Sequence, residues 1–137
     1  MAQYLCCRVG REWFGIPVVY VIEVLHFVAL NEIPGASPDV LGLLTLRDTV
    51  MPVIDLRVRF GHVDAAIELD TPIIALNTPQ GPAGIVVDDV DDVEQISQIE
   101  TRQDDALPHT QGVARLGERL LQILNVDQLR RGVVVGE

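Results

Sequence analysis

The 137-residue sequence contains no lysine, so its ten basic residues are all arginines. The absence of lysine excludes chemistry that needs an amine side chain, such as a Schiff base or the phosphate contact of a P-loop. Serine occurs only twice, as Ser37 and Ser97, and neither lies in a Gly-x-Ser-x-Gly nucleophile elbow. The longest uncharged run, residues 71–87, contains three prolines, which excludes a membrane-spanning helix there.

Cysteine is also scarce, since Cys6 and Cys7 are the only two and they are adjacent. Neighbouring residues of a strand point to opposite faces, so a disulfide between them would have poor geometry. We therefore interpret them as small residues of a strand in a reducing compartment, in preference to a redox or metal role. The apolar N-terminus has no basic lead-in and is interrupted by Arg8, so we expect no signal peptide and a cytoplasmic protein.

Acidic residues outnumber basic ones by 20 to 10, which gives a formal net charge of −10. This charge argues against binding nucleic acid and against direct contact with an anionic membrane surface. The hydrophobic fraction of 48% excludes intrinsic disorder, and the length allows one domain or two small ones with a shared core.

The 20 valines and 11 isoleucines, against six aromatic residues, favour strands. Short apolar runs between turn signals predict an all-β barrel or sandwich, with residues 18–27 open between a strand and a helical turn. Asp55 and Asn125 are expected to cap short helices that end at Gly61 and Gly132. The predicted strands are 3–9, 12–17, 41–46, 50–54, 71–77, 83–87, 93–99, 113–116 and 119–124.

The hairpin and helix of residues 42–61 have a counterpart seventy positions later, at residues 112–132. Residues 15–18 likewise resemble residues 84–87. Few residues are identical, and unrelated hairpins share this pattern, so duplication and coincidence both remain open at this level. A duplication would give two halves that are too small to be stable alone and that meet at a seam suited to a partner.

No catalytic constellation is visible in the sequence. His26, His62 and His109 fall in separate segments without the spacing of metal ligands, and dinucleotide or phosphate-binding glycine motifs are absent. We therefore expect neither enzyme activity nor a cofactor or metal.

Residues 88–105 carry eight acids and one base, and the densest part is residues 88–94. A calcium-binding or small-ligand site at residues 88–94 is one interpretation, because hard cations prefer clustered carboxylates. The spacing does not match an EF-hand loop, and a solvated turn between two strands is the interpretation that we favour. A third interpretation is that the negative charge of the segment attracts a basic partner surface during association.

Arg47 lies at the tip of the clearest predicted hairpin, beside Asp48. It is either an ordinary surface arginine or a recognition residue whose planar guanidinium holds a carboxylate or carbonyl. The sequence around it resembles the CheW-like adaptor domain of bacterial chemotaxis, whose hairpin reads Gly-x-x-Asn-Leu-Arg-Gly-x-x-x-Pro-Val-Ile-Asp-Leu. The matching segments are 42–57 (GLLTLRDTVMPVIDLR), 13–24 (WFGIPVVYVIEV), 32–38 (EIPGASP), 84–93 (GIVVDDVDDV) and 112–116 (GVARL).

The resemblance implies an all-β fold of two SH3-like five-stranded β-barrels with swapped elements and a few short helices. It implies a single domain over residues 4–131, made of intertwined halves at about 12–68 and 69–131, followed by a tail at 132–137. It also implies a non-enzymatic scaffold that couples methyl-accepting chemoreceptors to the histidine kinase CheA. The regulatory domain of the kinase would bind barrel to barrel, and the receptor tip would dock near the seam between the barrels.

In this resemblance the contact surface centres on Arg47, which matches the hairpin arginine of the family. Asp48 stands where the family usually has Gly, so a positive φ at this position would cost some strain, and Thr45 replaces the usual Asn. The pathway served, whether flagellar, pilus or another chemosensory system, stays open. The expected contact residues are Arg47, Asp48, Val28, Leu30, Ile33, Leu44 and Leu46, with ordinary barrel core as the alternative for the apolar ones.

Overall fold

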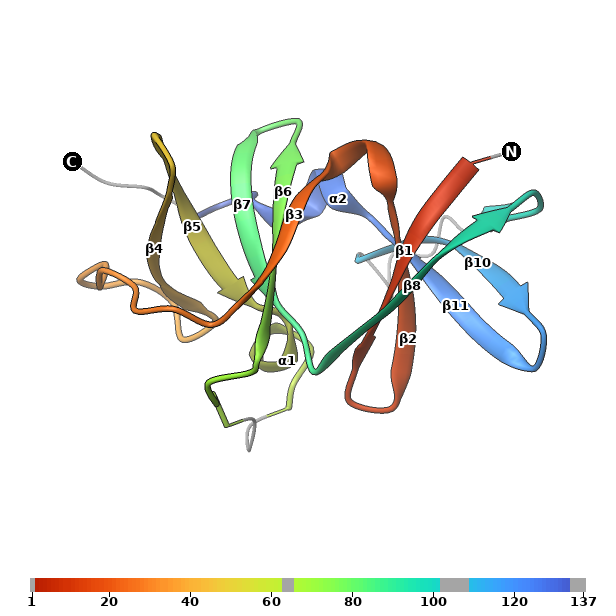
Figure 1. Ribbon diagram of the computed structural model, residues 1–137, viewed down its shortest axis with the longest axis horizontal. Helices are drawn as coiled ribbons and strands as arrows, with labels where there is room; N and C mark the ends of the chain where they lie inside the picture. Colours follow the sequence, from red (N-terminus) through yellow and green to blue (C-terminus); the bar gives the residue numbers. More distant parts are fainter. Residues whose placement is uncertain (1, 63–65, 102–108, 134–137) are drawn as a thin grey trace.

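Two β-sheets lie side by side along the long axis of the molecule in the computed structural model, which describes residues 2–62, 66–101 and 109–133 (Figure 1). The first sheet has the order β8-β1-β2-β11-β10-β9, and the second has the order β3-β6-β7-β5-β4. The strands of the first sheet are β1 (Ala2–Val9), β2 (Glu12–Pro17), β8 (Asp89–Ile96), β9 (Glu100–Thr101), β10 (Thr110–Leu116) and β11 (Arg119–Leu124). Those of the second are β3 (Val21–His26), β4 (Val40–Leu46), β5 (Thr49–Asp55), β6 (Pro72–Thr78) and β7 (Gly81–Val86).

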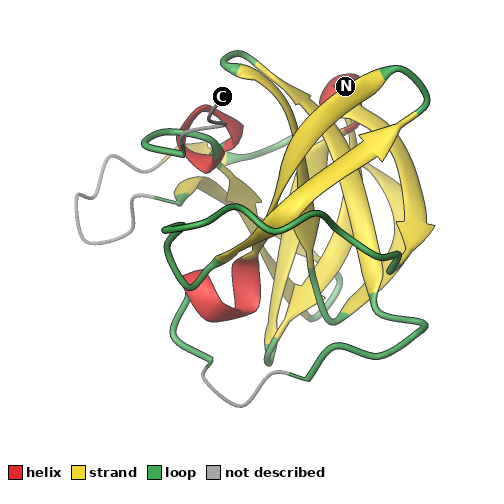
Figure 2. Cartoon of the chain, turned by 90° about the vertical axis from the view of Figure 1, so that its left-hand side faces the viewer, coloured by secondary structure: helices red, strands yellow, loops and turns green. Residues whose placement is uncertain are grey.

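Each sheet is curved, and in the view along the long axis the strands of the second sheet lie in front of those of the first (Figure 2). The prediction of an all-β, two-barrel fold is therefore confirmed, although the first sheet has six strands and not five, because the short strand β9 adds to its edge. The open segment 18–27 contains both alternatives, a 3-10 turn η1 (Val18–Tyr20) and then strand β3.

The structure confirms the internal repeat, because equivalent strands have the same pairing in both sheets. The parallel pairing of β5 with β7 matches Val53 to Gly84, and the parallel pairing of β11 with β2 matches Ile123 to Gly15, which are the equivalent positions. The halves 12–68 and 69–131 were expected to be intertwined with swapped elements, and the sheets contain such an exchange of strands. Strand β2 pairs with β11, and strands β6 and β7 pair with β3 and β5, so each barrel takes strands from both halves.

Three apolar clusters stabilise this arrangement. A central core lies between the sheets and receives Phe14 and Ile16 from the first sheet and Ile74 and Ile85 from the second. Each barrel also has a smaller core of its own. Because the largest cluster is shared, most of the burial that stabilises one barrel requires the other.

The two adjacent cysteines illustrate the alternation of a strand between two cores. Cys7 packs in the central core, Cys6 packs in the core of the first barrel, and both are buried free thiols. This confirms the prediction that they face opposite sides of β1.

Two short helices, α1 (Leu56–Arg59) and α2 (Val126–Leu129), follow the equivalent strands β5 and β11. Asp55 caps α1 as predicted, because its carboxylate accepts the backbone N–H of Arg57. Asn125 occupies the corresponding position of α2, but its side chain makes no capping hydrogen bond. None of the helices in the described ranges has the length and apolarity needed to span a bilayer.

The interpretation of the acidic segment as a solvated turn is wrong, because residues 89–94 belong to edge strand β8, which pairs with β1. A register shift interrupts this pairing between Leu5 and Cys7. The apolar residues Val90, Val93 and Ile96 are three apart in the sequence and Val93 is exposed, so the segment lacks the alternation that marks a strand. Residues 102–108 of the expected acidic loop and residues 134–137 of the expected tail lie outside the described residues.

Candidate functional site

The turn between β4 and β5 consists of Arg47 and Asp48, and its first residue has a left-handed backbone. Arg47 has a φ of 56° and is the only non-glycine with positive φ in the described part of the chain. The corresponding first positions of the β1–β2 and β10–β11 turns are Gly10 and Gly117, both with φ of 62°. The strain therefore falls on Arg47 and not on Asp48, and it costs about 1–2 kcal/mol relative to glycine.

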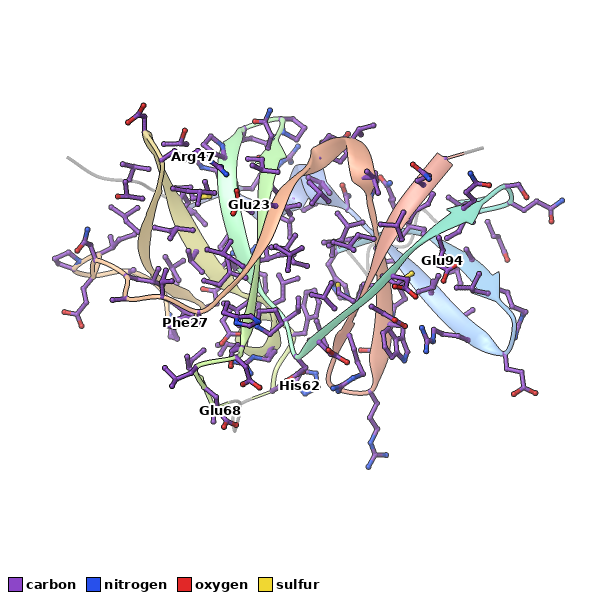
Figure 3. All side chains as sticks on the ribbon, in the orientation of Figure 1. Glu23, Phe27, Arg47, His62, Glu68 and Glu94 are labelled. Atoms are coloured by element: carbon purple, nitrogen blue, oxygen red, sulfur yellow. The ribbon has the colours of Figure 1, made fainter. Side chains whose placement is uncertain are left out.

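The guanidinium of Arg47 pairs with Glu23 of strand β3, with 2.7 Å between Nη1 and Oε1. Both side chains lie at the same end of the second barrel, where the pair links the hairpin tip to the opposite edge strand (Figure 3). The Arg47 side chain is 71% exposed, so the pair contributes less than about 1 kcal/mol to stability. The guanidinium of Arg47 is therefore largely accessible to solvent.

The structure separates the predicted contact residues into surface and core. Val28 is 41% exposed, and Ile33 is half-buried. Leu44 is only 3% exposed and lies in the core of the second barrel, so it is a core residue and not a contact. Leu30 and Leu46 are half-buried and pack against the same core. Both therefore fit the alternative interpretation, in which they are ordinary barrel-core residues.

Strand β3 contributes surface residues that the sequence analysis missed. Ile22 and Val24 are 44% and 42% exposed, and Val50 of β5 is 49% exposed. The alternation of exposed and half-buried residues along β3 was a signal for this, but residues 18–27 had not been assigned to a strand. Together with Arg47 and Glu23, these three residues form what we call the hairpin face.

A second surface has the equivalent place on the first barrel. Arg119, at the start of β11, pairs with Asp91 of edge strand β8 at 3.0 Å, as Arg47 pairs with Glu23. The pair with Arg119 lowers the pKa of Asp91. The Arg119 guanidinium also lies 3.7 Å from the ring centroid of Trp13, and Leu120 beside it is 52% exposed. The repeat thus creates two comparable surfaces at opposite ends of the molecule.

A buried ionic network joins the two barrels at the seam. Arg57 of α1 donates from Nε and Nη2 to the two carboxylate oxygens of Asp55, at 3.0 and 3.1 Å. Its Nη1 reaches Asp88 at 3.5 Å, and Asp88 accepts the backbone N–H of Gly10 in the β1–β2 turn at 2.7 Å. Burial disfavours the charged form of Arg57, but its bonds to Asp55 and Asp88 outweigh this effect and raise its pKa. Asp88 therefore links a turn of the first barrel to the helix of the second.

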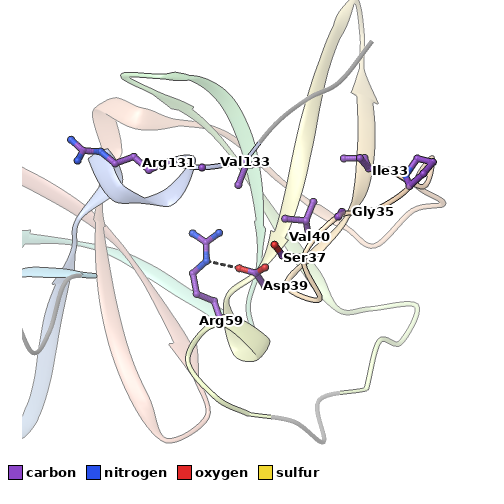
Figure 4. Close-up of a pocket in the computed structure, with 11 residues that line it drawn as sticks. Ile33, Gly35, Ser37, Asp39, Val40, Arg59, Arg131 and Val133 are labelled. Carbon is purple, nitrogen blue, oxygen red and sulfur yellow. Dashed lines mark hydrogen bonds and ion pairs between the residues drawn. The ribbon is translucent and has the colours of Figure 1, made fainter.

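The predicted contact Ile33 lines a hollow of about 310 Å³ between the loop before β4 and the segment after α2 (Figure 4). Arg59 crosses this hollow, because its Nε donates to Asp39 at 2.7 Å and its Nη1 donates to the carbonyl of Leu129 at 2.6 Å. These bonds attach α1 of the second barrel to the end of α2.

The remaining polar groups do not assemble a reactive centre among the described residues. Burial, and then the nearby Glu94, raise the pKa of Cys6 to about 11, and burial also raises the pKa of Cys7. Both thiols are therefore protonated and poor nucleophiles. Within ranges 2–62, 66–101 and 109–133, no three His, Cys, Asp or Glu side chains lie together in a way that could hold a metal ion.

His109 stacks on Phe60 near the seam, with ring centroids 4.2 Å apart, and Phe14 lies beside both rings. Burial lowers the pKa of His109, although the charge of Glu12 opposes this. The imidazole therefore takes up a proton in the unfolded chain at about pH 6.5, but in the folded protein only at lower pH.

Because the unfolded chain binds more protons in this window, we expect the free energy of unfolding to fall as the pH is lowered from about 6.5. The stability that the neutral His109 contributes is fully present above about pH 6.5. Urea unfolding between pH 7.5 and 5 will measure it, and His109→Gln will show a smaller pH dependence over the same window. An unchanged slope in the variant would contradict the assignment to His109.

Taken together, the fold and the site define a two-barrel protein with two exposed arginine-centred surfaces, a geometry suited to binding other proteins. Comparisons with known proteins agree with this class. The model of the CheW-like domain family matches residues 3–133. The chain is 30% identical over 133 residues to the chemotaxis protein CheW of Klebsiella aerogenes, which covers 93% of this chain and 80% of that protein. It is 26% identical over 135 residues to the chemotaxis protein CheW of Helicobacter pylori, with 93% and 80% covered.

A solved structure shows the same architecture. The scaffolding protein TtCheW from Thermoanaerobacter tengcongensis superposes with a TM-score of 0.82 at 27% identity, covering 90% of this chain and 88% of that one. This match confirms the prediction of two SH3-like barrels. The chain belongs to the CheW-like domain family.

Proposed function

We propose that this protein is a non-catalytic adaptor that couples chemoreceptors to the histidine kinase CheA in a cytoplasmic chemosensory array. Its family supports this role, since similar proteins are named chemotaxis and scaffolding proteins. An adaptor needs separate surfaces for separate partners, and the hairpin face and the seam are two such surfaces. The acidic character of the chain favours partners with basic contact surfaces.

The observation that carries the proposal is the backbone of Arg47. The two equivalent turns have glycine at this position, where glycine adopts the left-handed conformation without strain. A fold that needed only a turn would be more stable with glycine here as well. A strained residue whose side chain is exposed is typical of a functional contact.

The hairpin face gives the kinase regulatory domain a surface to bind, and the seam gives the receptor tip another. Arg47 lies at the tip of the hairpin that also carries the exposed Val50, and its partner Glu23 lies in β3 between the exposed Ile22 and Val24. Arginine is one of the residue types enriched in the hot spots of protein interfaces. At the seam, turn η1 connects the two sheets and leaves Val19 86% exposed.

Arg47→Gly is expected to separate binding from folding. The substitution relieves the left-handed strain and removes only an exposed ion pair, so the melting temperature should stay the same or rise. Binding to the regulatory domain of CheA should weaken about tenfold or more, since 1.4 kcal/mol is tenfold. Calorimetric titration and thermal melting will measure the two effects.

Arg11→Ala is the matched control, because Arg11 is an exposed arginine in the β1–β2 turn of the other barrel. It should bind and melt like the wild type. Wild-type affinity in Arg47→Gly would contradict the proposed contact, and a large fall in its melting temperature would show that Arg47 is structural.

A further inference from the structure

The turn before β6 presents an unusually exposed apolar side chain. Leu69 is 91% exposed, the highest value among the exposed large hydrophobic residues of the described chain. Glu68 and Asp70 flank it, and Ile67 nearby is 39% exposed. We call residues 66–71 the acidic turn, and Figure 3 shows it at the end of the second barrel away from Arg47.

The acidic turn is fixed at both ends, so its conformation is preorganised. The carbonyl of Ala66 accepts a hydrogen bond from Nη1 of Arg57 at 3.0 Å. At the other end, Thr71 is 6% exposed, its Oγ1 accepts the backbone N–H of Glu68 at 2.8 Å, and its own N–H donates to the carbonyl of Glu68 at 3.1 Å. A rigid turn loses little conformational entropy when it binds.

A hollow of about 720 Å³ near the seam is lined by apolar and basic side chains, in contrast to the acidic turn. Phe60 and the stacked His109 form one part of its wall, and the buried Leu129 forms another. The charged side chains that line it, within the described residues, are Arg59 and Arg131. Its lining residues are Arg59, Phe60, Gly61, His109, Gln128, Leu129 and Arg131.

The charge of this hollow contrasts with the rest of the chain, whose formal net charge is −10. Arg59 already pairs with Asp39, which leaves the exposed Arg131 as the main cation at the rim. An apolar side chain between two carboxylates therefore complements an apolar hollow with arginine at its rim. The acidic turn and the hollow that it complements both belong to the same chain.

We propose that a second copy of this chain inserts Leu69 of its acidic turn into the hollow lined by Phe60, His109 and Leu129. Glu68 and Asp70 of that copy then lie beside Arg131. The contact joins two different surfaces, so it is heterologous, and it leaves the hairpin face accessible. It is small, so it forms at high protein concentration.

Sedimentation velocity of the purified chain, from micromolar to millimolar concentration and at low and moderate salt, tests the proposal. The expected result is an association that increases with concentration at both salt concentrations. Leu69→Asp and Arg131→Glu should each remove it, and both should fold normally because both positions are exposed. Val93→Asp is the matched control, since Val93 is 47% exposed on strand β8 of the first barrel and its variant should associate like the wild type.

A mixture of the two defective variants gives the sharpest test. Leu69→Asp keeps an intact hollow and Arg131→Glu keeps an intact acidic turn, so an equimolar mixture should form a heterodimer and nothing larger. A monomeric wild type at millimolar concentration would overturn the proposal. So would an association that survives either variant, or a mixture that stays monomeric. These outcomes do not depend on CheA or on chemoreceptors, so they are distinct from the test of the adaptor role.

Discussion

Replacing Arg57 by methionine is expected to lower the free energy of unfolding by about 3–5 kcal/mol, because a buried carboxylate loses its partner. Asp55 is 1% exposed and bonds through both oxygens to the guanidinium. Asp88 loses the same partner, and with it the link between the barrels. Chemical unfolding monitored by circular dichroism will measure the change.

The double variant Asp55→Asn with Arg57→Met distinguishes a lost ion pair from lost packing. It should be more stable than Arg57→Met alone, because no unpaired charge remains buried. Arg11→Ala, which removes an exposed guanidinium, should change stability by less than about 0.5 kcal/mol. If Arg57→Met also lowered the free energy of unfolding by less than about 0.5 kcal/mol, the ionic network would contribute little to stability.

Phe14→Ala is expected to cost about 3–5 kcal/mol as well, for a different reason. Phe14 is completely buried in the central core and packs beside Phe60 and His109, so the substitution leaves a cavity between the barrels. A loss of this size is a large part of the stability of a typical domain, which is about 5–15 kcal/mol.

The central core also predicts how the variant unfolds. Because both sheets contribute to it, amide hydrogen exchange should accelerate together in β1 of the first sheet and β6 of the second. Val19→Ala is the control, since its side chain is 86% exposed and should change little. Faster exchange confined to one sheet would show that the barrels are stabilised independently.

The buried network shows why part of the site could be predicted and part could not. The cap of α1 by Asp55 joins residues two positions apart, so a polar residue before an apolar run was enough to predict it. Asp88 lies 31 positions from Arg57, and local patterns carry no information about such a pair. The same holds for Glu23, which only folding brings to Arg47.

Strand β8 was misjudged for a related reason. An edge strand can carry acids along its exposed side, so its composition looks like that of a loop. Its assignment depends on pairing with β1, which lies 81 to 94 positions earlier in the chain, and its apolar residues do not alternate with polar ones. The hairpin of β4 and β5 was predicted because its partner strands are neighbours in sequence.

The sequence by itself determined the all-β class, the repeated hairpin and helix, the arginine at the hairpin tip and the family. These depend on local propensity, short-range pairing and motifs, all of which neighbouring residues encode. Only the tertiary structure decided which strands the barrels exchange, that Leu44 lies in a core, and that the strained backbone is that of Arg47. These features depend on which distant strands meet, because burial, register and backbone strain are set by contacts between residues far apart in the chain.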